Sequence, residues 1–253
     1  TRFGETYSQR TKQVRRYYRE EYRKFKELHS TPAYNRLSVR LNYIFKGPVL
    51  EWYVRIKMKL EQNFRLYDQL LPKNGEILDL GCDYGYITYM LMLTSDERTL
   101  TGVDFDEEKI VVAQNGYLKN SRIEFIHDDV STYQISPTDG ILLGDVLHYL
   151  SPEKQKTLLQ ACMANLKSGG VLVIREGNAD LDSRHKRTLL SEFFSTRMLN
   201  FNKTEDANNQ LWFVSAKEIM KLTESVGFTF EMVDQGKRSS NVFMIIRRGR
   251  RGA

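Results

Sequence analysis

This 253-residue sequence has few cysteines, no long apolar run and no recognisable leader. Cys82 and Cys162 cannot build a disulfide framework, and no group of residues has the Cys/His spacing of a metal site. No apolar run approaches the roughly 20 residues that a membrane-spanning helix needs. The start of the chain is polar and basic, unlike a signal peptide. We therefore expect a cytoplasmic protein that binds no metal.

The composition is that of a folded protein. Hydrophobic residues make up 41% and charged residues 28% of the chain, which is typical of globular domains and not of disordered ones. The length suits one α/β domain, alone or with an appendage.

The positive charge lies at the two ends of the chain. The net charge is +6, which would favour a nucleic-acid partner if it were evenly spread. Residues 1–30 carry +5 and residues 237–253 carry +6, so the body between them carries −5. This distribution disfavours nucleic acid as a partner. The basic ends are either solvated surfaces or contacts with upstream domains of a longer polypeptide, with a membrane touched at most peripherally. The missing initial Met agrees with such an excised domain.

The hydrophobic pattern changes near residue 75. Residues 6–70 have a helical pattern interrupted at Thr31-Pro32 and Gly47-Pro48. Strands are then predicted at 76–80, 99–104, 123–127, 139–144, 170–175, 228–233 and 241–247, and helices at 85–94, 106–118, 152–166, 184–197 and 215–226. Alternation of this kind predicts an α/β fold: a Rossmann-like, doubly wound, seven-stranded sheet with an antiparallel last strand. Two parts follow, a helical extension (1–74, a cap or a linker to upstream domains) and a sheet domain (75–253).

The turn after the first strand is the most informative segment. It reads Asp79-x-Gly81-x-Asp83-x-Gly85 and opens a predicted helix, so its backbone can approach a ligand closely. A dinucleotide dehydrogenase would show G-x-G-x-x-G here, with a pyrophosphate on the helix terminus. Carboxylates on both sides of the turn repel a pyrophosphate but suit an ammonium or sulfonium cation. A nicotinamide cofactor is therefore disfavoured.

Acidic residues also follow the next three strands. Asp104 ends the second strand 19 residues after Gly85, the place from which an acid accepts hydrogen bonds from ribose hydroxyls. Asp128-Asp129 and Asp145 follow the third and fourth strands. All of these positions fall at the carboxyl ends of predicted parallel strands, where open α/β sheets bind their ligands.

With these motifs, residues 75–247 resemble the class I S-adenosylmethionine-dependent methyltransferases. ILDLGCDYG is similar to the family's first motif, VDFDEEKI to its second-strand acid, and FIHDDV, ILLGDVLHYL and LKSGGVLVIRE to its later motifs. The resemblance implies S-adenosylmethionine as cofactor, with Asp79 at the methionine ammonium, Asp104 at the ribose and Asp129 at the adenine. The cofactor-binding residues that it implies are Asp79, Gly81, Cys82, Gly85, Asp104, Phe105, Asp128, Asp129, Val130, Gly144 and Asp145. One departure is Asp83, where the family usually has glycine; its side chain would crowd the methionine or point outward.

Two further segments resemble a narrower group. YNRLSVRLNYIFKGPVLEWYVRIKMKLE and RHKRTLLSEFFSTRMLNFNK are similar to a methyltransferase domain at the end of large bacterial proteins. Those proteins also carry an acyltransferase-like and a transporter-like part, and some act in aryl-polyene or flexirubin-type pigment pathways. This resemblance implies that the chain is a C-terminal domain of such a protein.

Few side chains outside the cofactor motifs suggest a catalytic role. His148 follows the fourth strand and is our candidate general base, although it could instead only hydrogen-bond the backbone. Tyr17, Tyr18, Arg175 and His185 are the candidate acceptor-binding residues: the tyrosines if the first helix folds back, the other two by polar contacts.

The leading hypothesis is methyl transfer to a small-molecule or lipid-linked acceptor, aromatic or hydroxylated, at oxygen or carbon. The fourth-strand motif lacks the Asn/Asp-Pro-Pro-aromatic pattern of enzymes that methylate nucleic-acid amino groups, and it lacks a Pro-Cys. An RNA-directed methyltransferase remains the alternative among enzymes, motivated by the basic ends. A non-catalytic docking domain is the alternative from another class, supported by Asp83.

Overall fold

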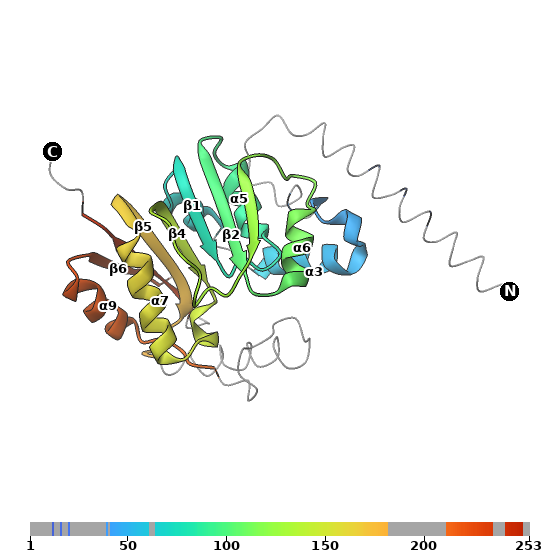
Figure 1. Ribbon diagram of the computed structural model, residues 1–253. Coiled ribbons are helices and arrows are strands. Elements are labelled where there is room, and N and C mark those ends of the chain that lie inside the picture. The colour runs from blue at the N-terminus through green and yellow to red at the C-terminus, as the bar shows by residue number, and fades with distance from the viewer. Residues whose placement is uncertain are drawn as a thin grey trace.

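The predicted sheet is confirmed by the computed structural model. The structure describes residues 12, 16, 20, 39, 41–60, 64–181, 211–234 and 241–249. Seven strands form one sheet in the order β3-β2-β1-β4-β5-β7-β6 (Figure 1). Their bounds are β1 (Gly75–Leu80), β2 (Arg98–Asp104), β3 (Ile123–His127), β4 (Thr138–Gly144), β5 (Leu166–Gly177), β6 (Thr229–Val233) and β7 (Asn241–Arg247). Strands β1 to β5 are parallel to one another, and β7 runs antiparallel to both β5 and β6.

Helices cover both faces of this sheet (Figure 1). One face carries η1 (Ile44–Lys46), α3 (Pro48–Leu60), α4 (Phe64–Leu70), α5 (Tyr86–Leu93) and α6 (Glu107–Gln114). The other carries η2 (Leu147–Tyr149), α7 (Pro152–Ala164) and α9 (Ala216–Ser225). Alternate residues of the central strand β4 serve the two faces: Leu142 packs with the first group, and Ile141 and Leu143 pack with the second. All three are fully buried, as expected of a doubly wound sheet.

Local sequence signals account for where the helices begin. Asp106 caps α6 by accepting from the Glu108 N–H, and Ser151 and Ser215 cap α7 and α9 in the same way. The predicted break at Gly47-Pro48 is confirmed, because Gly47 has a φ of 96° and α3 begins at Pro48. The predicted helix at 106–118 ends earlier, at Gln114. The break at Thr31-Pro32 and the predicted helix at 184–197 lie outside the described residues.

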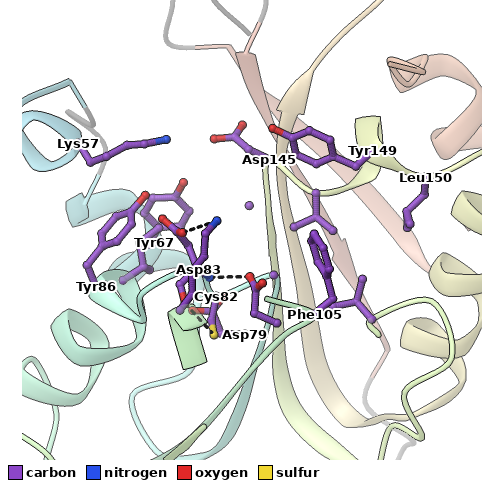
Figure 2. A pocket seen from close by; sticks show the side chains of 17 residues that line it. Lys57, Tyr67, Asp79, Cys82, Asp83, Tyr86, Phe105, Asp145, Tyr149 and Leu150 are labelled. Atoms are coloured by element: carbon purple, nitrogen blue, oxygen red, sulfur yellow. Dashed lines mark hydrogen bonds and ion pairs between the residues drawn. The ribbon is translucent and has the colours of Figure 1, made fainter. Parts of the chain in front are cut away.

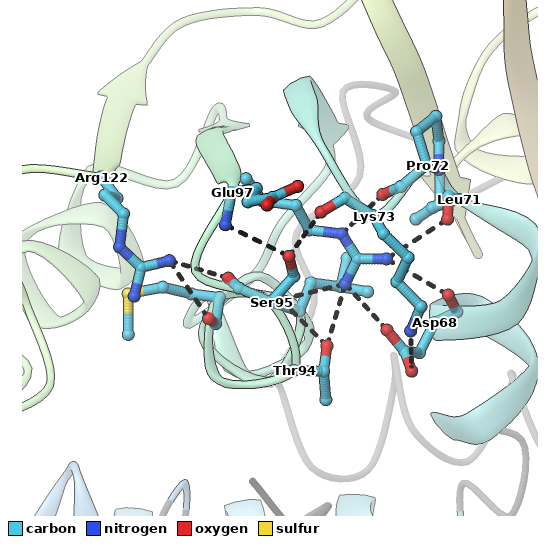
Figure 3. Close-up of polar contacts among 11 residues, drawn as sticks. Asp68, Leu71, Pro72, Lys73, Thr94, Ser95, Glu97 and Arg122 are labelled. Carbon is cyan, nitrogen blue, oxygen red and sulfur yellow. Dashed lines mark hydrogen bonds and ion pairs between the residues drawn. The ribbon is translucent and has the colours of Figure 1, made fainter.

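At the amino end of β2, a buried arginine ties α4 to the sheet (Figure 3). Arg98 is fully buried and donates to the Asp68 carboxylate at 2.8 Å, to the Thr94 hydroxyl at 2.9 Å and to the Pro72 carbonyl at 2.6 Å. Lys73 pairs with the second carboxylate oxygen of Asp68. This contact makes α4 part of the sheet's packing, although it precedes the first strand.

In the ranges that the structure describes, we find no helix with the length and apolar character to cross a membrane.

Candidate cofactor and acceptor cleft

A cleft opens at the carboxyl ends of β1, β2 and β4 (Figure 2). Eight of the cofactor-binding residues predicted from the sequence line it: Asp79, Gly81, Cys82, Asp104, Phe105, Val130, Gly144 and Asp145. They come from four separate segments that the parallel strands bring to one edge. These residues meet at the edge that the strand-end rule predicts, and their part in cofactor binding stays a prediction.

Several other predicted residues are not among those that line the cleft. Gly85 caps α5 behind the turn, and its φ of 74° and its close approach to the Phe125 ring require glycine for packing. Asp128 is exposed, and the Asp129 carboxylate accepts from the N–H and hydroxyl of Ser131. Tyr17, Tyr18 and His185 lie outside the described residues, so their roles stay predictions.

The turn after β1 is held tightly against its neighbours. Gly81 has a φ of 79°, and a Cβ there would collide with the Val146 side chain, so only glycine fits. The N–H groups of Gly81 and Cys82 both donate to the Val103 carbonyl, at 2.7 and 3.0 Å. The turn is thus fixed to β2 and to the segment after β4, so a ligand meets a preformed backbone.

Asp83, the departure from the family pattern, lines the cleft and also holds it together. Its φ of 54° lies in the left-handed region, which explains why glycine suits this position. One carboxylate oxygen pairs with Lys109 Nζ at 2.8 Å, and the other accepts from the Tyr53 hydroxyl at 3.1 Å. The Asp83 N–H donates to Asp104 at 2.8 Å. The side chain is therefore turned toward α3 and α6.

Asp104 is positioned by backbone donors. Its two oxygens accept from the N–H groups of Asp106 at 3.0 Å and Asp83 at 2.8 Å, and the residue is 6% exposed. Burial raises the pKa of the Asp104 carboxyl, although the nearby Lys109 ammonium and the two N–H donors oppose the rise. Its rigid placement suits a group that must accept hydrogen bonds from a ligand.

Asp79 is the most deeply buried acid of the cleft. It is 3% exposed and accepts a hydrogen bond of 2.6 Å from the Thr88 hydroxyl. Burial raises the pKa of Asp79 to about 7, and the neighbouring Asp104 and Asp83 add to the rise, while the Thr88 bond opposes it. A cation bound beside Asp79 would reverse this effect by favouring the ionised form.

The cleft has an excess of acid. Four carboxylates line it, with the two lysines Lys57 and Lys109 as the cationic lining groups. Burial alone would lower the pKa of Lys109, but its ion pair with Asp83 and the nearby Asp104 raise that pKa above its usual range. Asp145 pairs with Arg175, which is not itself in the lining. A lining rich in carboxylates fits S-adenosylmethionine, because its ammonium and sulfonium are cationic and its ribose hydroxyls need hydrogen-bond acceptors.

His148, the predicted general base, lies behind the cleft. It is 1% exposed, is not in the lining, and its Nδ1 is 2.6 Å from Glu176, which is equally buried. Burial alone would raise the pKa of Glu176, but the His148 charge and hydrogen bonds lower it below its usual range. The imidazole also stacks on the Phe213 ring, with ring centroids 5.3 Å apart. The pair thus fixes the segment whose Asp145 and Tyr149 face the cleft.

Sequence reasoning missed the wall opposite that segment. Lys57 of α3, Tyr67 of α4 and Tyr86 of α5 line the cleft, facing Tyr149 and Leu150 across it (Figure 2). The sequence predicts acceptor contacts in the first helix and around the end of the fifth strand. Lys57 and Tyr67 precede the first strand, so no strand-end rule applies to them, and only the folded chain brings them here.

Known proteins that are similar to this chain agree in part with the resemblance predicted from its sequence. Residues 77–170 match the sequence model of a family described as "Methyltransferase domain". The carboxy-S-adenosyl-L-methionine synthases of Campylobacter fetus subsp. fetus and Chromohalobacter salexigens are 28% and 29% identical over 109 and 131 residues. These matches cover 42% and 50% of this chain and 46% and 48% of the relatives. The chain thus spans about half the length of the curated relatives it matches.

Solved structures show the same fold. Human N-acetylserotonin methyltransferase in complex with S-adenosylmethionine gives a TM-score of 0.58 at 20% identity, covering 93% of this chain and 66% of that one. The N-methyltransferase NodS from Bradyrhizobium japonicum, in complex with S-adenosylhomocysteine, gives 0.52 at 20% identity, with 75% and 90% covered. The family model thus identifies a methyltransferase domain over residues 77–170, and the solved structures show its fold. The narrower resemblance to multidomain acyltransferase proteins stays a prediction.

Proposed function

We propose that the chain transfers a methyl group from S-adenosylmethionine to a small-molecule or lipid-linked acceptor, at oxygen or carbon. The observation that carries the proposal is the acidic cleft at the ends of β1, β2 and β4, whose four carboxylates all belong to the segment 77–170 that matches the methyltransferase family model. Asp79, the Gly81 turn and Asp104 lie there side by side on a preformed backbone.

In this proposal each end of the cofactor meets a suitable group. Asp79 binds the methionine ammonium, the backbone at Gly81 lies against the methionine portion, and Asp104 accepts from the ribose hydroxyls. Phe105 and Val130, the apolar lining residues after β2 and β3, hold the adenine. The carboxylates also favour the cationic cofactor over its neutral thioether product, which aids product release.

The chain's own part in the chemistry is mainly alignment. When bound, the cofactor supplies a methyl group on a positively charged sulfur, which keeps the electron pair of the broken bond. The cleft walls hold the acceptor in line and exclude water; good alignment can supply about 7–11 kcal/mol. The acceptor atom gains the methyl group and releases its proton, which passes to the solvent. His148 and Glu176 act as positioning residues for Asp145 and Tyr149; a general-base role for His148 stays a prediction.

Calorimetry and a transfer assay test the proposal. We expect S-adenosylmethionine and S-adenosylhomocysteine to bind at micromolar levels, and label from methyl-labelled cofactor to appear in an acceptor. Lack of binding at millimolar concentration would contradict the proposal. Binding without transfer to any candidate acceptor would instead support the docking-domain alternative.

A second candidate follows from the curated relatives, which are named for making carboxy-S-adenosyl-L-methionine. Lys57 favours it, since a lysine facing the cleft could hold a carboxylate beside the cofactor. Mass spectrometry of the cofactor after incubation with carboxylic acids distinguishes the two, because this candidate requires a carboxylated cofactor and no methylated acceptor.

A further inference from the structure

We propose that the acceptor of this cleft is a small, flat molecule bearing a carboxylate, which Lys57 binds. The inference rests on the proposed methyl transfer and names its substrate class. It depends on where Lys57 lies, on how α3 is anchored and on the aromatic walls beside it.

Among the residues that the structure describes, Lys57 is a cation that lines the cleft and forms no ion pair there. Within the described ranges, Lys109 is paired with Asp83 and Arg175 with Asp145, whereas no carboxylate forms an ion pair with Lys57. Figure 2 shows its ammonium directed into the cleft, across from Asp145 and far in the view from Asp79. The cationic cofactor would be held at Asp79, so an anion at Lys57 would sit at the other end of the cleft.

The Asp83 side chain anchors the helix that carries Lys57. Asp83 accepts from the hydroxyl of Tyr53, which is 6% exposed and lies one turn before Lys57 on α3. The Tyr53 ring packs edge-on against Tyr84 at 5.5 Å, and Lys57 Nζ lies 5.7 Å from the Tyr53 ring centroid. Asp83 thus links the turn after β1 to α3, the helix that carries Lys57.

Aromatic walls define the rest of the acceptor's shape. Tyr67 and Tyr86 stand on one side and Tyr149 on the other (Figure 2). Tyr67 is fixed by edge-on packing against Phe243, with ring centroids 5.0 Å apart. Rings of this kind favour a planar body between them. A lysine at one end and tyrosines along the sides therefore match a flat acid, with its reacting atom turned toward the Gly81 turn.

Matched probes test the inference without knowledge of the true acceptor. We would titrate 4-hydroxybenzoate and 4-hydroxybenzamide into the protein saturated with S-adenosylhomocysteine, by calorimetry. The acid should bind about tenfold more tightly than the amide, in keeping with a charge-assisted hydrogen bond.

Lys57→Met should abolish that preference and Lys57→Arg should keep most of it. Affinity for S-adenosylhomocysteine should change less than twofold in either variant. Lys119→Met, at an exposed lysine outside the cleft, is the matched control.

A second variant tests the anchor. Tyr53→Phe keeps the ring but removes the hydroxyl that donates a hydrogen bond to Asp83. It should reduce the preference for the acid over the amide about threefold. Equal binding of acid and amide, binding of neither, or a preference that survives Lys57→Met would overturn the inference while leaving the proposed function standing. Failure of S-adenosylhomocysteine to bind would overturn both.

Discussion

Strand β2 begins with one buried charge and ends with another, and the surroundings of the two charges differ. Arg98 opens the strand and is fully buried, while Asp104 closes it and is 6% exposed. Arg98 has an acidic partner in Asp68, a hydroxyl and a set of carbonyls around it. Asp104 has two N–H donors and a lysine nearby, but two further carboxylates, Asp79 and Asp83, crowd it.

The difference separates structural charge from functional charge. At the amino end, every nitrogen of the Arg98 guanidinium donates, so nothing is left for a ligand to supply. At the carboxyl end, acids outnumber bases, burial raises the pKa of Asp79 and Asp104, and a cation would relieve both. One end of the strand maintains the fold, and the other is prepared for a positively charged ligand.

The largest expected effect is on stability, at the amino end. Arg98→Ala leaves the buried Asp68 carboxylate without its arginine partner, so the free energy of unfolding should fall by about 3–5 kcal/mol. Urea unfolding followed by circular dichroism measures the change. Lys167→Ala, which removes a more exposed pair with Glu76 and Asp139, should cost less than about 1 kcal/mol. Similar losses for the two variants would mean that the buried arginine contributes no more to stability than a more exposed ion pair does.

At the carboxyl end, the loss should fall on binding and spare the fold. Asp104→Ala removes the proposed ribose acceptor, so affinity for S-adenosylhomocysteine should drop by about 2–3 kcal/mol, roughly 30- to 150-fold. Glu107→Gln, an exposed loss of the same charge three residues away, should leave affinity unchanged. Calorimetry gives both numbers. An Asp104 variant that binds normally would contradict the proposed site.

Asp79 should make binding depend on pH. Because burial raises its pKa to about 7, its stabilising contribution to the folded protein is present at low pH and lost as pH rises through 7, relative to an unfolded value of about 3.9. The ionised carboxylate binds an ammonium group best, and S-adenosylhomocysteine keeps the ammonium of the cofactor. Its affinity should therefore rise about tenfold from about pH 6 to about pH 8, with proton release on binding. Calorimetry in buffers of different ionisation enthalpy detects that release. Asp79→Asn should flatten both profiles; a wild-type profile without pH dependence would rule out the ammonium role.

The contrast between the two ends also marks what the sequence could predict. The acids at strand ends can be predicted from the sequence, because Asp79 and Asp104 stand at or near the ends of apolar runs. Parallel strands then bring such ends together at one edge of the sheet. Arg98 gave no such signal, because its partners Asp68, Thr94 and Pro72 belong to different segments joined only in the fold. The same reason hid Lys57. Local pattern locates the proposed cofactor side of the cleft, whereas long-range packing builds the proposed acceptor side.

The smallest effect on cofactor affinity is expected at Asp83, where the sequence departs from the methyltransferase motif that it resembles. Asp83→Gly restores the family's usual residue and removes a side chain whose oxygens face Lys109 and Tyr53, so affinity for S-adenosylhomocysteine should change less than about threefold. The variant also removes the Asp83 carboxylate that pairs with the buried Lys109, which should cost about 1–3 kcal/mol of stability. The double variant Asp83→Gly, Lys109→Met should recover most of that loss, as measured by urea unfolding. A gain in affinity above tenfold would instead mean that Asp83 obstructs the cofactor, and would favour the docking-domain alternative.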